Sequence, residues 1–446
     1  MKKLVAAVDL GTTKVVSVVG EKSESGYRIV ALKEAPSKGI MRGEVVNIQN
    51  VLESLKPTLE EIRAEGIEIS EVYVGIAGQN IKCNSARISR NRSRSSEWIT
   101  NREVEEMERE MFNSRVNAGE KILHVIPQSY NVDDNVGVKE AVGMTGTRIE
   151  GDYKLFIGKT NSFEHSKIVI ERAGLKLKDI ILEPVASAKA VLTEDEMELG
   201  VAMVDMGGGT TDLLIIQDNI IRHTAVIPFG GNSITEDLRQ GCGVSLRNAE
   251  QMKIQYGSCY SDRAPDNKTV IIPGLGGRDS REVAFKVIAG IIEARVEEII
   301  EAIMYEIENS GYQDKLHAGI VITGGSSQLK DLRDFVSLKT GLDARIASPD
   351  PSVIFDGCEG TFKPGSSTAV GLIIHGFELE EMKKSSIAVS AAYSDELFPE
   401  EEVAVSPQTK NDDKKDKSEK PHKKRSFMKS FGEIMIGDIF NSSNEA

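Results

Sequence analysis

The stretch Val8-Asp9-Leu10-Gly11-Thr12-Thr13-Lys14 decides the fold of this chain, because a related stretch, Val204-Asp205-Met206-Gly207-Gly208-Gly209-Thr210-Thr211-Asp212, recurs near its middle. Each stretch lies between two short apolar runs, which predicts a β-hairpin with a tip rich in glycine and threonine. Such a tip can bring backbone N–H groups and hydroxyls close to a phosphate, because glycine has no Cβ to block the approach. Either loop alone could simply close a hairpin. The presence of two such loops predicts that they face each other and bind a triphosphate from both sides.

Asp9 and Asp205 each stand at the end of the first strand of their hairpin. A carboxylate beside phosphates holds Mg²⁺, usually through water. We therefore expect both aspartates to lie near a magnesium ion.

Composition narrows the class of protein. The chain has 446 residues, which predicts about two to four domains. Its net charge of −14 argues against a general nucleic-acid binder, because affinity for phosphate backbones rests on clustered Lys and Arg. The 4 cysteines are scattered, so neither a zinc site nor a disulfide framework is indicated, and a reducing cytosol is the simplest setting.

The N-terminal apolar run faintly resembles a signal peptide, because it follows Lys2 and Lys3. It stops at Asp9, which is too early for such a segment, and we predict a buried strand instead. No window of the sequence approaches the roughly 18 to 20 apolar residues of a membrane span. Any membrane contact is therefore expected to be peripheral.

Five segments follow one another in an order that resembles the actin, heat-shock ATPase and sugar kinase superfamily. They are the loop at Asp9, the strand-to-helix segment at Glu183, the loop at Asp205, the turn Thr323-Gly324-Gly325 and the segment Ala369-Val370-Gly371. The resemblance spans residues 1 to about 376. It implies an α/β, actin-like ATPase fold, in which two ribonuclease-H-like halves clamp Mg-ATP in a cleft.

The resemblance also implies roles for residues on both sides of this cleft. One side would cradle the β- and γ-phosphates with Gly11, Thr12, Thr13 and Lys14, and the other with Gly207, Gly208, Gly209, Thr210 and Thr211. The adenosine would lie on Gly324, Gly325 and Ser326, and the phosphate side of the floor would continue through Gly230, Gly231 and Asn232. Glu250 and Lys253, three apart on one helix face, would reach the ribose and adenine, or would form a solvated Glu/Lys pair.

Hydrolysis of ATP requires a group that orients water in line with the γ-phosphate. Glu183 matches the carboxylate that related ATPases place beside the cleft. The alternative is a strand-end glutamate held in a salt bridge. The first interpretation predicts that Glu183, with Asp9 and Asp205, forms the catalytic set.

Further stretches are similar to those of the FtsA family of actin-like bacterial division proteins. They include Ile122-Leu123-His124-Val125-Ile126-Pro127-Gln128, Val142-Gly143-Met144-Thr145-Gly146 and Arg222-His223-Thr224-Ala225-Val226-Ile227-Pro228. In that family a small α+β module inserted in the first half replaces an actin subdomain and recruits later division proteins. A linker and an amphipathic helix end the chain in that family.

The resemblance implies the following organisation. The first-half core comprises residues 1–83, 164–195 and about 366–378, and the inserted module comprises 84–163. The second-half core comprises 196–232 and 316–365, with an outer subdomain at 233–315. A flexible linker at 379–424 leads to an amphipathic helix at 425–441.

The C-terminal helix can be tested by helical geometry. At about 100° per residue, six apolar side chains fall within an arc of about 140°; they are Phe427, Met428, Phe431, Ile434, Met435 and Ile439. Nearby lysines and Arg425 add the positive charge that anionic headgroups attract. This pattern predicts a helix that lies on an anionic membrane surface. Docking onto a protein groove is the alternative, because Gly432 and Gly437 weaken the helix and Asp438 falls on the apolar arc.

The family tethers the tubulin-like protein FtsZ through its C-terminal tail. Arg295 matches the helix position where the family carries a tail-binding arginine, whose planar fork suits carboxylates. It could equally be a surface arginine paired with Glu298 or Glu301.

Together with these observations, the resemblance to this family implies an ATP-binding protein, with at most slow ATPase activity, that tethers FtsZ polymers to the cytoplasmic face of the inner membrane at the division site. It is expected to self-associate into filaments or minirings and to recruit later division proteins through the inserted module. The rivals are a pilus-assembly scaffold of similar fold and a small-molecule kinase of the sugar kinase type. The kinase would need a catalytic aspartate base and a substrate pocket, for which the sequence shows no motif.

Overall fold

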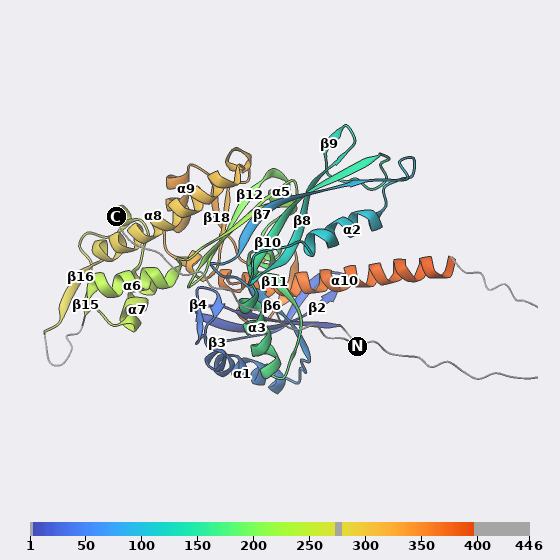
Figure 1. Ribbon diagram of the computed structural model, residues 1–446. Coiled ribbons are helices and arrows are strands. Elements are labelled where there is room, and N and C mark those ends of the chain that lie inside the picture. The colour runs from blue at the N-terminus through green and yellow to red at the C-terminus, as the bar shows by residue number, and fades with distance from the viewer. Residues whose placement is uncertain (1–2, 273–278, 397–446) are drawn as a thin grey trace, which may run out of the picture. The chain divides into compact units, whose positions relative to one another are not determined.

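The computed structural model describes residues 3–272 and 279–396, and helices alternate with strands along most of this part (Figure 1). Both predicted hairpins are confirmed. In the first, β1 (Leu4–Leu10) pairs antiparallel with β2 (Lys14–Ser23), and in the second, β12 (Val201–Met206) pairs with β13 (Thr211–Gln217). Each hairpin belongs to a mixed sheet of its own, so the two halves expected from the sequence have the same construction.

The first-half sheet has six strands with β1 and β2 near its centre. Its order is β11 (Lys176–Leu182), β6 (Glu71–Ile76), β1, β2, β3 (Gly26–Pro36) and β19 (Ile354–Gly357). The turn between β3 and the first helix holds the short strands β4 (Ile40–Met41) and β5 (Glu44–Val45).

Helices cover both faces of this sheet. Helix α1 (Ile48–Ala64) begins where the side chain of Asn47 accepts a hydrogen bond from the Asn50 N–H, and its apolar stripe packs with Val8 of β1. The neighbouring residue Ala7 points to the opposite face, as alternation along a strand requires, and packs with α4 (Glu183–Val191) and α10 (Ser367–Glu396). Helix α3 (Thr160–Arg172) lies beside α1, and α5 (Glu194–Leu199) leads into the second half.

The second-half sheet has five strands in the order β14 (Ile220–Ile227), β13, β12, β17 (Ile320–Thr323) and β18 (Ala344–Ile346). Its helices are α6 (Gly231–Cys242), α7 (Leu246–Tyr256), α8 (Phe285–Ser310) and α9 (Leu332–Thr340). Short elements between them are η1 (Ser261–Arg263), β15 (Thr269–Ile272), β16 (Arg281–Ala284), η2 (Gln313–Lys315) and η3 (Gly325–Gln328), and η4 (Pro364–Ser366) precedes α10. Helix α8 buries Ile288, Ile292 and Val296 in the same core as β12.

A separate antiparallel sheet forms the inserted module. Its order is β7 (Lys82–Asn91), β10 (Arg148–Lys159), β8 (Glu120–Val132) and β9 (Asn135–Val138), and α2 (Asn101–Phe112) packs on it. The module therefore runs from about residue 82 to 159. The predicted end at residue 163 lies about one helical turn too late, because α3 starts at Thr160 and belongs to the first-half core.

The expected boundary of the second half also needs correction. Residues up to 365 were assigned to it, but β19 pairs in parallel with β3 and so completes the first-half sheet. The chain returns to the first half at Ile354, before α10 begins. A strand of four residues carries too little pattern to reveal which sheet it joins.

The flexible linker expected from residue 379 does not begin there. Helix α10 continues to Glu396, and Glu380 on it is 6% exposed. Glu380 forms ion pairs with Lys178 of β11 and with Lys3, while Glu381 pairs with Lys22 at 2.7 Å. These acidic residues therefore fix the helix to the first-half sheet, although their composition resembles that of a linker.

The remainder of the predicted linker and the whole amphipathic helix at 425–441, including Phe427 to Ile439, lie outside the described residues. Among the helices that the structure does describe, none combines the length and the apolar character needed to cross a membrane.

Candidate functional site

The tips of the two hairpins touch each other. A Cβ placed on Gly208 would lie 1.7 Å from Oγ1 of Thr13, and one on Gly209 would lie 2.6 Å from Oγ1 of Thr12. Both distances are shorter than any real Cβ contact, so the two loops can approach this closely only because glycine occupies these positions. The structure therefore brings the predicted phosphate loops together, as a two-sided grip requires.

The predicted floor residues lie directly behind the second loop. The backbone N–H groups of Gly231 and Asn232 donate to the carbonyl oxygens of Gly207 and Gly208, at 3.0 and 2.8 Å. From the turn at Gly324, the hydroxyl of Ser326 also donates to the Gly207 carbonyl, at 2.8 Å. The segment at Gly231 and the turn at Gly324 thus both hold the same loop in place.

Glu250 and Lys253 form an ion pair of 2.8 Å on α7, and the two side chains differ in exposure, at 41% and 11% respectively. The ammonium group of Lys253 also donates to the Gly231 carbonyl at 3.0 Å and to the Thr235 hydroxyl at 2.9 Å. The pair is therefore more than a solvated surface contact, because its buried lysine ties α7 to the floor of the loops.

The turn at Gly324 closes the site from the side of β17. Gly324 has φ +88°, and a Cβ there would lie 2.3 Å from Oδ1 of Asp205. Its neighbour Gly325 has no atom within 4 Å of its own Cβ position, so it faces open space. A flat group could lie on this backbone, which agrees with the adenosine position that the resemblance implies.

On the first loop, the contacts of Thr12 and Lys14 differ. The hydroxyl of Thr12 accepts a hydrogen bond from the N–H of Gly43 at 3.1 Å, which links the loop to the β4–β5 turn. The Lys14 ammonium is 2.5 Å from the carboxylate of Glu34, so in this structure it points along the sheet to an exposed partner. Lys14 would have to leave Glu34 to contact a phosphate.

Four acidic side chains gather beneath the two tips. Asp9, Asp205 and Asp212 are at most 8% exposed, and Glu183 is partly buried. Oδ2 of Asp212 accepts from the Thr210 hydroxyl at 3.3 Å, whereas its Oδ1 is buried without a hydrogen-bond partner. Sequence reasoning quoted Asp212 as part of the loop but gave it no role, although its place at the start of a buried strand was a signal.

The crowding of like charges is visible in the pKa values of these groups. Burial and the neighbouring carboxylates raise the pKa of Asp9 to about 7 and that of Asp212 to about 8, although Lys14 partly offsets the effect on Asp9. Burial, followed by the charges of Asp9, Asp212 and Asp205, raises the pKa of Glu183 well above its ordinary value. Because these buried carboxylates repel one another when they are ionised, binding of a cation between them is favoured.

These residues fit Mg²⁺ and a nucleotide. Glycine at 208, 209 and 324 lets Thr13, Thr12 and the Asp205 carboxylate approach the backbone closely, Gly325 faces open space, and the buried Oδ1 of Asp212 lacks a hydrogen-bond partner. Within the described ranges, no three acidic, histidine or cysteine side chains are placed to bind one metal ion directly.

Glu183 is the first residue of α4, directly after β11. Its side chain lies over β6, where a Cβ on Gly75 would be 2.9 Å from the Glu183 Cγ. No ion pair of Glu183 is found among the described residues, so the salt-bridge alternative has no partner there. The sequence offered no reason to assign Gly75 to the site, because a glycine in an apolar strand can serve packing, a bulge or a turn as well as a nearby functional side chain.

Arg295 lies on α8 and contacts Phe229 and α6. Its Nε and Nη2 donate to the two oxygens of Asp237 at 2.6 and 3.1 Å, its Nη1 donates to Glu298 at 2.5 Å, and its guanidinium lies 5.4 Å from the ring centroid of Phe229. The side chain is 22% exposed. Of the two expected partners, the structure shows Glu298, and it adds Asp237, which the sequence did not indicate.

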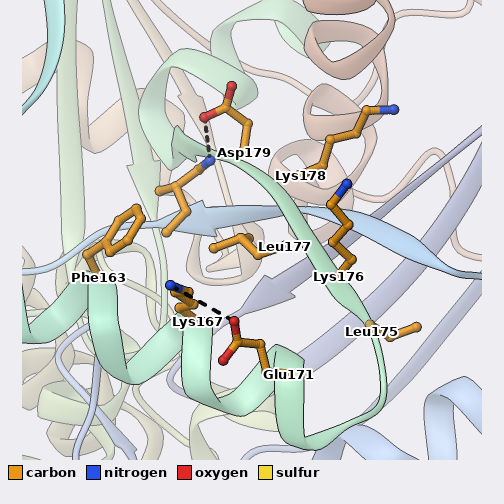
Figure 2. A pocket seen from close by; sticks show the side chains of 9 residues that line it. Phe163, Lys167, Glu171, Leu175, Lys176, Leu177, Lys178 and Asp179 are labelled. Atoms are coloured by element: carbon orange, nitrogen blue, oxygen red, sulfur yellow. Dashed lines mark hydrogen bonds and ion pairs between the residues drawn. The ribbon is translucent and has the colours of Figure 1, made fainter. Parts of the chain in front are cut away.

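A cavity of about 590 Å³ lies between α3 and β11, on residues that the phosphate-loop site does not use (Figure 2). Phe163, Lys167 and Glu171 come from α3, and Leu175 to Ile180 come from the segment that forms β11. We do not assign the nucleotide to this cavity, although it is large. The glycines and carboxylates that converge at the two hairpin tips do not line it.

Comparisons with known proteins identify the family. Residues 202–371 match the family model "Cell division protein FtsA", and residues 78–157 match "SHS2 domain inserted in FTSA", which coincides with the inserted module. The cell division protein FtsA of Pseudomonas aeruginosa is 34% identical over 396 residues, which span 88% of this chain and 94% of that protein.

Solved structures give the same fold at lower identity. A PilM–PilN type IV pilus biogenesis complex aligns with a TM-score of 0.61 at 15% identity, covering 83% of this chain and 98% of that one. MreB 5 of Spiroplasma citri bound to AMPPNP aligns with a TM-score of 0.53 at 15% identity, covering 87% of this chain and 99% of that one. These likenesses confirm the actin-like fold. Taken with the family matches and the relative of 34% identity, they leave one conclusion: the chain belongs to the FtsA family of cell division proteins.

Proposed function

We propose that this chain binds Mg-ATP between its two hairpin tips and uses the nucleotide to control its own assembly while it tethers FtsZ polymers to the membrane. The observation that carries the nucleotide part is the contact of Gly208 and Gly209 with Thr13 and Thr12. Only glycine permits this approach, and the same backbone can surround a phosphate. Nucleotide binding by an actin-like relative, the AMPPNP-bound MreB, supports the assignment.

Each side of the site has its own task in this proposal. The backbone N–H groups of Gly11 to Thr13 and of Gly207 to Thr210 bind the β- and γ-phosphates, and Gly324, Gly325 and Ser326 support the adenosine. Asp9 and Asp205 hold Mg²⁺ through water, and Asp212 adds a third buried carboxylate to the same region. When bound, Mg²⁺ neutralises charge on the phosphates.

Hydrolysis is slow and secondary. Glu183 orients the attacking water with its carboxylate, which must be ionised to accept the proton. Burial and the neighbouring aspartates raise the pKa of Glu183, which disfavours the ionised form that accepts the proton, and this agrees with slow hydrolysis. The nucleotide then sets the angle between the two halves, and hydrolysis resets it.

The tether has three contacts. The predicted helix at 425–441 binds anionic lipid at the cytoplasmic face of the inner membrane, the outer subdomain at 233–315 binds the C-terminal tail of FtsZ, and the inserted module recruits later division proteins. Self-association into filaments or minirings brings many such tethers together at the division site, which raises their combined affinity for an FtsZ polymer. Family membership supports this assignment, because the relatives are cell division proteins.

Arg295→Glu tests the proposed FtsZ contact. We expect the affinity for a labelled FtsZ C-terminal tail peptide, measured by fluorescence anisotropy, to fall about 10- to 100-fold, because hydrogen bonds to a charged group are lost. The tail carboxylates compete with Asp237 for the guanidinium. Asp237→Asn should therefore leave the affinity unchanged or increase it.

A matched control is Arg239→Glu, which changes an exposed arginine of the same subdomain that is paired only with Glu236 among the described ion pairs. It should bind the peptide like the wild type. Thermal unfolding of all variants verifies that the subdomain is folded. Unchanged peptide affinity in a folded Arg295→Glu protein would remove Arg295 from the FtsZ site.

A further inference from the structure

Two hydroxyl groups hold one oxygen of the Asp205 carboxylate. The Ser187 hydroxyl donates to Oδ2 of Asp205 at 2.6 Å, and the Thr368 hydroxyl donates to the same atom at 3.1 Å. The two hydroxyl oxygens are 3.0 Å apart. Ser187 is fully buried and Asp205 is 7% exposed, so water does not compete freely for these contacts. The carboxylate therefore has a fixed orientation.

The donors and the acceptor belong to different halves of the fold. Asp205 lies on β12 of the second half, whereas Ser187 lies on α4 and Thr368 lies in the first turn of α10, both of which pack on the first-half sheet. Ser187 follows Glu183 by four residues, so the two side chains stand on one face of α4. A single helix thus presents the proposed water-orienting group and a group that holds Asp205.

The second oxygen of Asp205 lies close to the turn at Gly324. A Cβ on Gly324 would lie 2.3 Å from Oδ1, so glycine at this position leaves room for the carboxylate. The orientation of the carboxylate therefore depends on α4, α10 and this turn. Contacts of this kind around a metal-binding carboxylate decide how well it is oriented.

We propose that Ser187 and Thr368 are positioning residues, which hold the Asp205 carboxylate in the orientation that binds hydrated Mg²⁺ with the nucleotide. This inference rests on the proposed function, because it assigns the residues a role toward the metal. It adds two residues that neither hairpin contains. It also makes metal binding depend on how the first half is placed against the second, since the two hydroxyls come from the first half.

The expected effect follows from the behaviour of outer-shell groups at metal sites, whose loss lowers metal affinity by about 10- to 100-fold. The double variant Ser187→Ala/Thr368→Val keeps the shape of both side chains nearly intact and removes both hydroxyls. We expect it to need about 10 to 100 times more Mg²⁺ than the wild type for half-maximal binding of a fluorescent ATP analogue. Nucleotide affinity in EDTA should be unchanged.

Conservative replacements separate positioning from packing. Ser187→Thr and Thr368→Ser retain the hydroxyl donors and should restore the wild-type Mg²⁺ requirement. A structural role alone would change the melting temperature without this selective shift. The control is Ser17→Ala/Thr58→Val, which removes a second pair of buried hydroxyls, 2.7 Å apart, between β2 and α1. It should leave the Mg²⁺ requirement as in the wild type.

The inference is overturned if the folded Ser187→Ala/Thr368→Val protein binds the ATP analogue with the wild-type Mg²⁺ requirement, or if the Ser17→Ala/Thr58→Val control shows the same shift. Failure of the proposed function looks different, because the wild type itself would then bind no ATP analogue at any Mg²⁺ concentration. That result would overturn both.

Discussion

Glu183→Gln is expected to bind Mg-ATP as tightly as the wild type while its hydrolysis rate falls about 100- to 10,000-fold, the usual contribution of a positioned acid–base group. Glutamine has the shape of the protonated glutamate. It therefore keeps the packing against Gly75 and can still contact water. It cannot accept a proton from that water.

The same carboxylate predicts how hydrolysis depends on pH. Burial and the surrounding aspartates raise the pKa of Glu183 well above its ordinary value, and only its ionised form accepts a proton. The wild-type rate should therefore increase as the pH rises through that pKa, whereas the residual rate of Glu183→Gln should not follow this titration. Release of labelled phosphate in single-turnover reactions measures both rates, even when turnover is slow.

A matched control is Glu194→Gln, which removes the same charge at an exposed position of α5. Its binding and hydrolysis should equal those of the wild type. Unchanged hydrolysis in Glu183→Gln would mean that another group orients the water, and loss of nucleotide binding would mean that Glu183 supports the site structurally.

Deleting Phe427 to Phe440 is expected to release the protein from anionic vesicles almost completely. Burial of one large apolar side chain stabilises binding by about 1.5 to 3 kcal/mol, and each nearby Lys or Arg adds about 1 kcal/mol on an anionic surface. Six apolar side chains share one arc of the predicted helix, so their combined loss exceeds that of any single contact in the tether. Co-sedimentation with vesicles of phosphatidylcholine and phosphatidylglycerol measures the release.

Two point variants test whether the helix lies on the lipid as its pattern predicts. Phe431→Glu places a charge on the apolar arc and should weaken vesicle binding strongly, whereas Ser430→Glu places it on the opposite face and should weaken binding much less. Equal effects would argue against an amphipathic anchor. Vesicle binding that persists after the deletion would place the anchor elsewhere in the chain.

The hairpins and the loops at their tips could be predicted from the sequence because their signals are local. Apolar strands flank Gly-Thr tips in both halves, and the contact of Gly208 with Thr13 follows once the loops face each other. The floor residues Gly231 and Asn232 were also expected, and they bond directly to the second loop. These features need only short-range pattern and the order of the segments.

The features that were missed depend on contacts between distant parts of the chain. The hydroxyl of Thr368 reaches a carboxylate 163 residues earlier, and no periodicity marks such a pair. Likewise, Lys22 pairs with Glu381, 359 residues away, so an acidic stretch that resembles a linker forms an anchored helix. Local sequence cannot distinguish a solvated charge from one whose partner arrives only when the fold closes.

The most direct test of the tethering function is recruitment of fluorescent FtsZ filaments to anionic vesicles by the full chain, with and without ATP and Mg²⁺. The predicted result is a layer of FtsZ on the vesicles that requires the full chain, increases with Mg-ATP and disappears when Phe427 to Phe440 are deleted. FtsZ that stays in solution with the full chain and Mg-ATP present would contradict the account.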